Sequence, residues 1–188
     1  MEVSRLTRDA TRYQKAGGYE LALKTLEKAY RIVEKVDHAS AANIKYDMGV
    51  IHCKRGDDLL AARAYTESSV HYKKAGDLFS HLNLLVTVVH LCIELRDYWH
   101  ALFQLESLVE YYQSRHDTLK CSEFSYQACQ CLLAHNQVDD LRNLFTEYQG
   151  QIIMETQRDR IQYLLTLYNK VDRPSDWESI IFDREDSF

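Results

Sequence analysis

Two stretches of the chain share one spacing of small, aromatic and aliphatic residues. The first is ATRYQKAGGYELALKTLEKA, residues 10–29, and the second is GVIHCKRGDDLLAARAYTES, residues 49–68. The first match starts at Ala10 and the second at Gly49, and a weaker one starts at Val89 and a degenerate one at Ala128. Four matches at a nearly constant period indicate an internal structural repeat.

Each repeat has the pattern of a helical hairpin. The glycines at 17 and 56 fall where a first helix must end, because glycine tolerates the left-handed conformation found there. A small residue at position 10 or 49 lets the two helices approach closely. One hairpin cannot bury its apolar face alone, so neighbouring hairpins must stack. We therefore predict an all-α, right-handed α-solenoid of about four hairpins, over residues 3–36, 42–75, 82–115 and 121–150, with the Gly76-Asp-Leu-Phe79 turn between the second and the third.

The sequence after the fourth hairpin predicts a capping helix followed by an acidic tail. An apolar stripe predicts one capping helix over residues 151–171, formed by Ile152, Ile153, Ile161, Leu164, Leu165 and Tyr168. The repeat domain would then cover residues 1–171. The tail, 172–188, has six acidic residues against two arginines, and Ser175-Asp-Trp-Glu178 has the form of a capping box for a short helix over 176–182. Its apolar residues either dock into another protein or fold back onto the last hairpin: Trp177, Ile180, Ile181 and Phe182.

Composition narrows the functional classes. One proline and six glycines are too few for a β-sandwich or barrel, and a net charge of −5 without a concentrated basic patch gives no reason to expect a nucleic-acid partner. The longest uncharged stretch, residues 82–93, is too short for a transmembrane segment. We also expect no secretory signal between Met1 and Ala16, a cytoplasmic location with a nuclear one left open, and free thiols for the five cysteines.

Catalytic and metal-binding patterns are not found in the sequence. Phosphate-binding, metalloprotease and nucleophile-elbow motifs are missing. Cys129 and Cys131 stand two residues apart, so on a helix they point to different faces and do not share one tetrahedral metal ion easily. His52 and His135 have no nucleophile at a suitable spacing. We expect a protein that is not an enzyme and that has no cofactor and no metal site.

The hairpin pattern resembles the tetratricopeptide repeat (TPR) family, in the stretched form found in vesicle-fusion attachment proteins and spindle-orientation adaptors. The shared features are Gly or Ala, an aromatic residue, Gly-x-Tyr, Ala, an aromatic residue or Leu, and Ala, and the resemblance covers roughly residues 3–148. The period of about 39–40 residues departs from the family's 34, and the proline that usually closes each repeat is missing.

The resemblance implies a groove lined by the first helix of each hairpin. Its residues here would be Thr7, Thr11, Lys15, Asn43, Tyr46, Val50, Lys54, Asn83, Val86 and His90, with Ser122, Ser125 and Cys129 in the fourth hairpin. Thr7 and Thr11 replace the Lys and Asn of the family's carboxylate clamp, so we expect no such clamp. Asparagine amides could instead hold a peptide backbone. The alternative is that these residues form only a solvated face.

The sequence thus favours protein binding, by an adaptor or scaffold that holds a partner polypeptide in this groove. The alternative is an obligate structural subunit of a larger trafficking or regulatory complex. The apolar stretch Leu84 to Val89 supports that alternative if it needs cover from a partner.

Overall fold

A computed structural model describes residues 2–136, 142–169 and 176–182. Within these ranges all regular structure is α-helical, which confirms the predicted all-α class. The helices are α1 (Glu2–Lys15), α2 (Tyr19–Val33), α3 (His38–Arg55), α4 (Asp58–Ala75), α5 (Leu78–Glu94), α6 (Tyr98–Ser114), α7 (Thr118–Ala134), α8 (Arg142–Gln151), α9 (Glu155–Tyr168) and α10 (Trp177–Ile181). None of them is long and apolar enough to cross a membrane.

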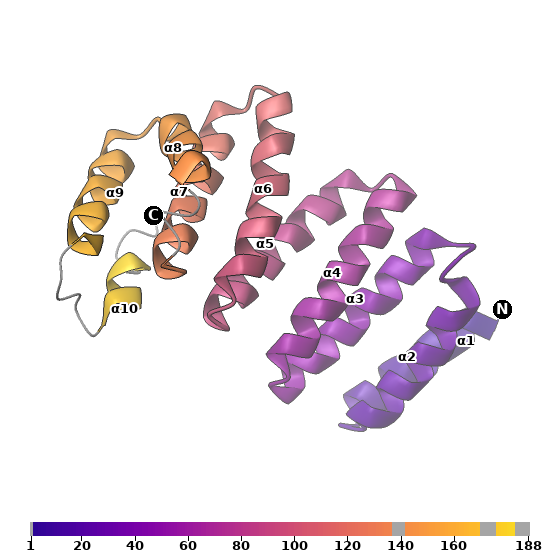
Figure 1. Cartoon of the computed structure of the whole chain (residues 1–188). Coiled ribbons are helices and arrows are strands. Elements are labelled where there is room, and N and C mark those ends of the chain that lie inside the picture. Colours follow the sequence, from indigo (N-terminus) through magenta and orange to yellow (C-terminus); the bar gives the residue numbers. More distant parts are fainter. Residues whose placement is uncertain (1, 137–141, 170–175, 183–188) are drawn as a thin grey trace. The chain divides into compact units, whose positions relative to one another are not determined.

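The helices form two compact units, Met1–Leu95 (unit 1) and Arg96–Phe188 (unit 2). In unit 1 each helix packs on the next, from α1 to α5. In unit 2, α6, α8, α9 and α10 all pack on α7, and Figure 1 shows the last three gathered around it. Packing between consecutive helices is that of a helical repeat protein. The division falls between the two helices of the predicted third hairpin.

A period shorter than the predicted hairpin repeat marks where the central helices begin. Their N-caps are aspartates at a constant interval along the chain: Asp37, Asp57, Asp77, Asp97 and Asp117. Four of these carboxylates accept a hydrogen bond from the backbone N–H three residues later, at 3.0 to 3.4 Å. Because each such bond satisfies a backbone donor that the first turn leaves free, it stabilises the start of α3, α5, α6 and α7, whereas Asp57 before α4 makes no such bond.

Most helix ends from α1 to α7 are followed by a residue in the left-handed conformation. Gly17, Gly56 and Gly76 have φ of +77°, +76° and +80°, which confirms the predicted helix ends and the turn at Gly76. Arg96, His116 and Asn136 occupy the same place with φ near +58° although they carry side chains. The turn after α2 is the exception, since the residues around its Asp37 cap include none with positive φ.

Close approach of the hairpin helices depends on small residues, as predicted. A Cβ atom on Gly49 would lie 2.5 Å from Cε1 of Tyr65, so the α4 tyrosine fills the space that a side chain on α3 would need. Ala10 and Ala128, which hold the equivalent place in α1 and α7, are fully buried. The small residue at this position therefore fixes how closely the two helices pack.

The predicted capping helix over 151–171 is wrong in its N-terminal part. Gln151 ends α8, Met154 is extended, and α9 begins only at Glu155. Ile152 is buried and Ile153 is half-exposed in the connection, so neither belongs to the helical stripe, whereas Ile161, Leu164 and Tyr168 do form its buried face. The chain turns here so that α8 and α9 can both lie on α7. Residues 170 and 171 lie outside the described part.

Candidate functional site

The ten residues predicted to line a groove all lie in unit 1, on α1, α3 and α5. Seven of them are exposed, and Thr7, Val50 and Val86 are half-buried. We call this set the first-helix face. The threonine hydroxyls of α1 donate to their own helix, Thr7 Oγ1 to the Ser4 carbonyl at 3.3 Å and Thr11 Oγ1 to the Thr7 carbonyl at 3.0 Å. They can therefore offer a partner acceptors but no free donor.

The α3 part of the first-helix face is held in place by α4. The hydroxyl of Tyr72 donates to Oδ1 of Asn43 at 2.7 Å, which fixes the side-chain amide and leaves its NH₂ group to donate elsewhere. The Tyr46 ring is 43% exposed and lies 5.6 Å from the ring of Tyr65, which itself packs on Gly49. An oriented amide donor thus stands one helical turn from a half-exposed aromatic ring.

The fourth-hairpin residues predicted for the groove do not belong to an exposed face. Ser122, Ser125 and Cys129 are completely buried. Ser122 Oγ accepts a hydrogen bond from the Ile153 backbone at 2.9 Å, and Ser125 Oγ donates to Oε1 of Gln151 at 2.7 Å. The prediction failed because α7 is covered by α8, α9 and the connection between them.

The described part of the tail, residues 176–182, lies against unit 2 and matches the fold-back alternative. Trp177 and Ile181 of α10 are buried, and the Gln130 side chain donates to the Ile181 carbonyl at 2.7 Å. Phe182 stacks on Tyr98 with ring centroids 5.4 Å apart. Ser175, the first residue of the predicted capping box, is outside the described residues, and the Asp176 side chain makes no capping hydrogen bond.

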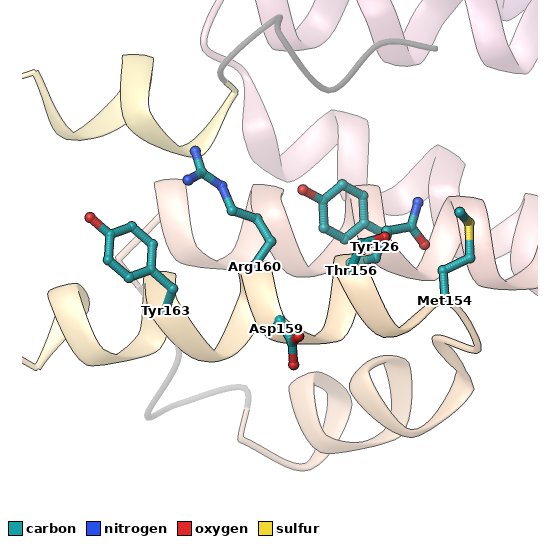
Figure 2. Close-up of a pocket in the computed structure, with 7 residues that line it drawn as sticks. Tyr126, Met154, Thr156, Asp159, Arg160 and Tyr163 are labelled. Carbon is teal, nitrogen blue, oxygen red and sulfur yellow. The ribbon is translucent and has the colours of Figure 1, made fainter.

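A half-open cavity of about 480 Å³ lies beside α7 and α9, and the sequence did not predict it. Its lining includes Tyr126 of α7 and Asp159, Arg160 and Tyr163 of α9, and Figure 2 shows Asp159 on the other side of α9 from Arg160. Arg160, the basic residue among those lining the cavity, donates a hydrogen bond to the Ile180 carbonyl at 2.7 Å, so it already has a partner within the protein. The cavity therefore has an aromatic wall without a cluster of catalytic side chains.

A histidine pair links α2, α3 and α4 inside unit 1. Nδ1 of His38 and Nδ1 of His71 are 3.2 Å apart, and Nε2 of His71 is 3.0 Å from the Tyr30 hydroxyl. Burial and the neighbouring His38 lower the pKa of His71. Two Nδ1 atoms at this distance share one proton, so the pair is intact only when at least one ring is neutral. The partners of His71 are far from it along the chain, and no local spacing indicates this network.

The cysteines of α7 have the environment of packing residues. Cys129 and Cys131 are buried, and burial raises the pKa of the Cys129 thiol. Among residues 2–136, 142–169 and 176–182 there is no group of three or more His, Cys, Asp or Glu side chains placed to hold a metal ion. Tyr148 of α8 is buried as well, at 2% exposed.

No protein-family model matches the chain, and no curated protein matches it. The function is therefore argued from the geometry of the chain.

Proposed function

We propose that the chain is a protein–protein interaction module, an adaptor or scaffold that holds a segment of a partner polypeptide on the first-helix face of unit 1. The observation that carries the proposal is the Asn43 amide, oriented by Tyr72 beside the exposed ring of Tyr46. A free NH₂ group can donate to a main-chain carbonyl of the partner, and the ring offers apolar surface for one of its side chains.

The rest of the first-helix face extends this surface with a mixture of polar and apolar groups. Lys54 and His90 are exposed, and Val50 and Val86 are half-buried between exposed neighbours. These residues stand on helices that pack on α4, so their backbone is already ordered before a partner binds. Binding on such a surface loses little conformational entropy on this side of the interface.

Removing the two side chains that carry the proposal tests it directly. The full chain, tagged and immobilised, is used to capture proteins from native extract, and each captured protein is quantified for wild type and for the Asn43→Ala/Tyr46→Ala variant. We expect a partner whose recovery falls at least about tenfold, since loss of a hydrogen bond and an aromatic contact costs more than about 1.4 kcal/mol. The matched control, Leu59→Ala/Arg63→Ala, removes two exposed side chains of α4 and should retain it.

A second variant tests the orientation of the amide. Tyr72→Phe removes only the hydroxyl that holds Asn43. We expect a smaller reduction in capture than for Asn43→Ala, with unchanged circular dichroism. Equal capture by wild type and Asn43→Ala/Tyr46→Ala would refute the proposal.

The second candidate is an obligate subunit of a larger complex. Its original basis is weakened, because Leu84, Leu85, Val88 and Val89 are all buried in the chain itself. What favours it is the exposure of Val36 (82%) and Phe79 (76%) in unit 1. Light scattering on the isolated full chain distinguishes the two. A soluble monomer supports the adaptor, and aggregation relieved by one stoichiometric partner supports the subunit.

A further inference from the structure

Helix α6 carries two large aromatic side chains on its outer face. Trp99 and Phe103 are 51% and 62% exposed, although Ala101, Leu102, Leu105 and Leu108 of the same helix are buried. They stand four residues apart, so they lie next to each other on one face. The edge of the Trp99 ring is supported by His135, with centroids 5.9 Å apart. Aromatic residues held in this way outside a core are typical of contact sites.

Three carboxylates continue the same surface. Glu106 and Glu110 follow Phe103 at intervals of three and four residues on the outer face of α6, and Glu147 is exposed on α8. No ion pair involves them among the residues that the structure describes. Burial, and then the charges of Glu106, Glu147 and Glu110, raise the pKa of the Tyr148 phenol.

The Tyr148 hydroxyl is a second indication that a partner binds to this surface. The side chain is only 2% exposed, and its hydroxyl has no hydrogen-bond partner in the described part of the chain. An unpaired buried hydroxyl is costly, and carboxylates without a counterion gain no ion-pair stabilisation. Lys or Arg side chains of a partner would offset the negative charge of Glu106, Glu110 and Glu147.

We propose that the face formed by Trp99, Phe103, Glu106, Glu110 and Glu147 docks a basic segment of a partner protein. An aliphatic or aromatic side chain of that segment covers Trp99 and Phe103, and Lys or Arg side chains one to two helical turns away pair with the carboxylates. Arginine suits this site best, because its guanidinium has several donors for neighbouring carboxylates. The negative charge of this face disfavours nucleic acid and anionic membranes as partners. This surface belongs to unit 2 and does not depend on the first-helix face.

A display library of random 12-residue peptides, selected on the immobilised full chain, tests the partner chemistry. We expect enrichment of peptides in which Lys or Arg follows an aliphatic or aromatic residue within about two helical turns. The best peptide, labelled with fluorescein, is then titrated by fluorescence polarisation. Its affinity should fall at least about tenfold for Glu106→Gln/Glu110→Gln and should weaken as salt is raised. The control Glu2→Gln/Glu20→Gln changes the net charge equally in unit 1 and should bind like wild type.

Tryptophan quenching by acrylamide gives an independent measurement at the site. Trp177 is buried, so quenching reports mainly Trp99, and a bound peptide without tryptophan should reduce it. Phe103→Ala should weaken the peptide without changing the circular dichroism spectrum. The proposal is overturned if no basic peptide is enriched, if the glutamine variants bind the selected peptide as well as wild type does, or if the bound peptide leaves Trp99 equally open to quencher.

Discussion

The regular spacing of helix starts continues from unit 1 into α6 and α7 of unit 2, but the two units have different residues in the turns. The turns after α1, α3 and α4 use Gly17, Gly56 and Gly76, for which a positive φ has no steric cost. The turns of unit 2 place Arg96, His116 and Asn136 in that conformation. For a residue with a side chain this costs about 1–2 kcal/mol, and less for asparagine. Other contacts of unit 2 must therefore offset the steric cost of these turns.

Those contacts come from residues distant in sequence. Arg96 forms an ion pair with Glu178 at 3.0 Å, and α10 closes over α7 with Trp177 and Ile181. Unit 1 has no comparable segment laid across its helices in the described residues, and its core contains many alanines that bring helices close together. The turns of unit 1 are therefore favoured by their own residues, whereas the turns of unit 2 depend more on contacts between residues that are distant in sequence.

The largest effect is expected from a substitution that removes the long-range contact between α10 and the rest of unit 2. Trp177→Ala removes a buried indole that packs near Tyr168 and should cost about 3 kcal/mol. Hydrogen exchange followed by mass spectrometry, which reports each unit separately, should show faster exchange in α7, α9 and α10. Unchanged protection of α7 would mean that α10 does not stabilise unit 2.

Gly49→Ala should break the closest helix contact of unit 1. The added methyl would stand 2.5 Å from the Tyr65 ring, so α3 and α4 must separate or the ring must move, at a cost of about 2 kcal/mol. The control is Gly150→Ala in α8, where nothing lies within 4 Å of the new Cβ and helix propensity favours alanine by about 0.5 kcal/mol. Chemical denaturation should give opposite signs for the two variants.

A pair of turn substitutions sharpens the comparison of helix ends. Gly56→Ala forces a side chain into a positive-φ position in unit 1 and should destabilise it by about 1 kcal/mol. His116→Gly relieves the same strain in unit 2. Because glycine also gives the unfolded chain more freedom, which opposes this gain, the net stabilisation should be only about 0.5 kcal/mol. Shifts of the same sign in thermal denaturation would contradict our explanation of the turns.

The smallest effect is expected from pH, and it should be seen in unit 1. Burial is the largest cause that lowers the pKa of His71, His52 and His81, all of which lie in that unit. A histidine with a lowered folded pKa stabilises the fold fully above its unfolded pKa of about 6.5, and the contribution is lost as pH falls below that value. Hydrogen exchange at decreasing pH, corrected for intrinsic rates, should show α2 to α4 weakening. The His71→Gln variant should show a smaller pH dependence.

Much of the fold could be predicted from local patterns. The helices, the ends at Gly17 and Gly56 and the small residue at 49 follow from spacing, and the five N-cap aspartates were also visible in the sequence as a regular period. The candidate face on α1, α3 and α5 was assigned from the resemblance to the tetratricopeptide repeat family, and its ten residues are exposed or half-buried. Its use by a partner remains a proposal.

What the sequence determined is therefore the succession of helices, the helix ends at Gly17 and Gly56, and the small residues at which two helices approach closely, because these depend on propensity, capping and steric limits within a few residues. Only the tertiary structure decided that Ser122, Ser125 and Cys129 are covered, that residues 176–182 fold back, and that Asn43 is oriented by Tyr72. Burial, and then carboxylates of both α6 and α8, likewise raise the pKa of Tyr148. Such features depend on which helices contact one another in the folded protein, and the spacing of residues within one helix does not predict that.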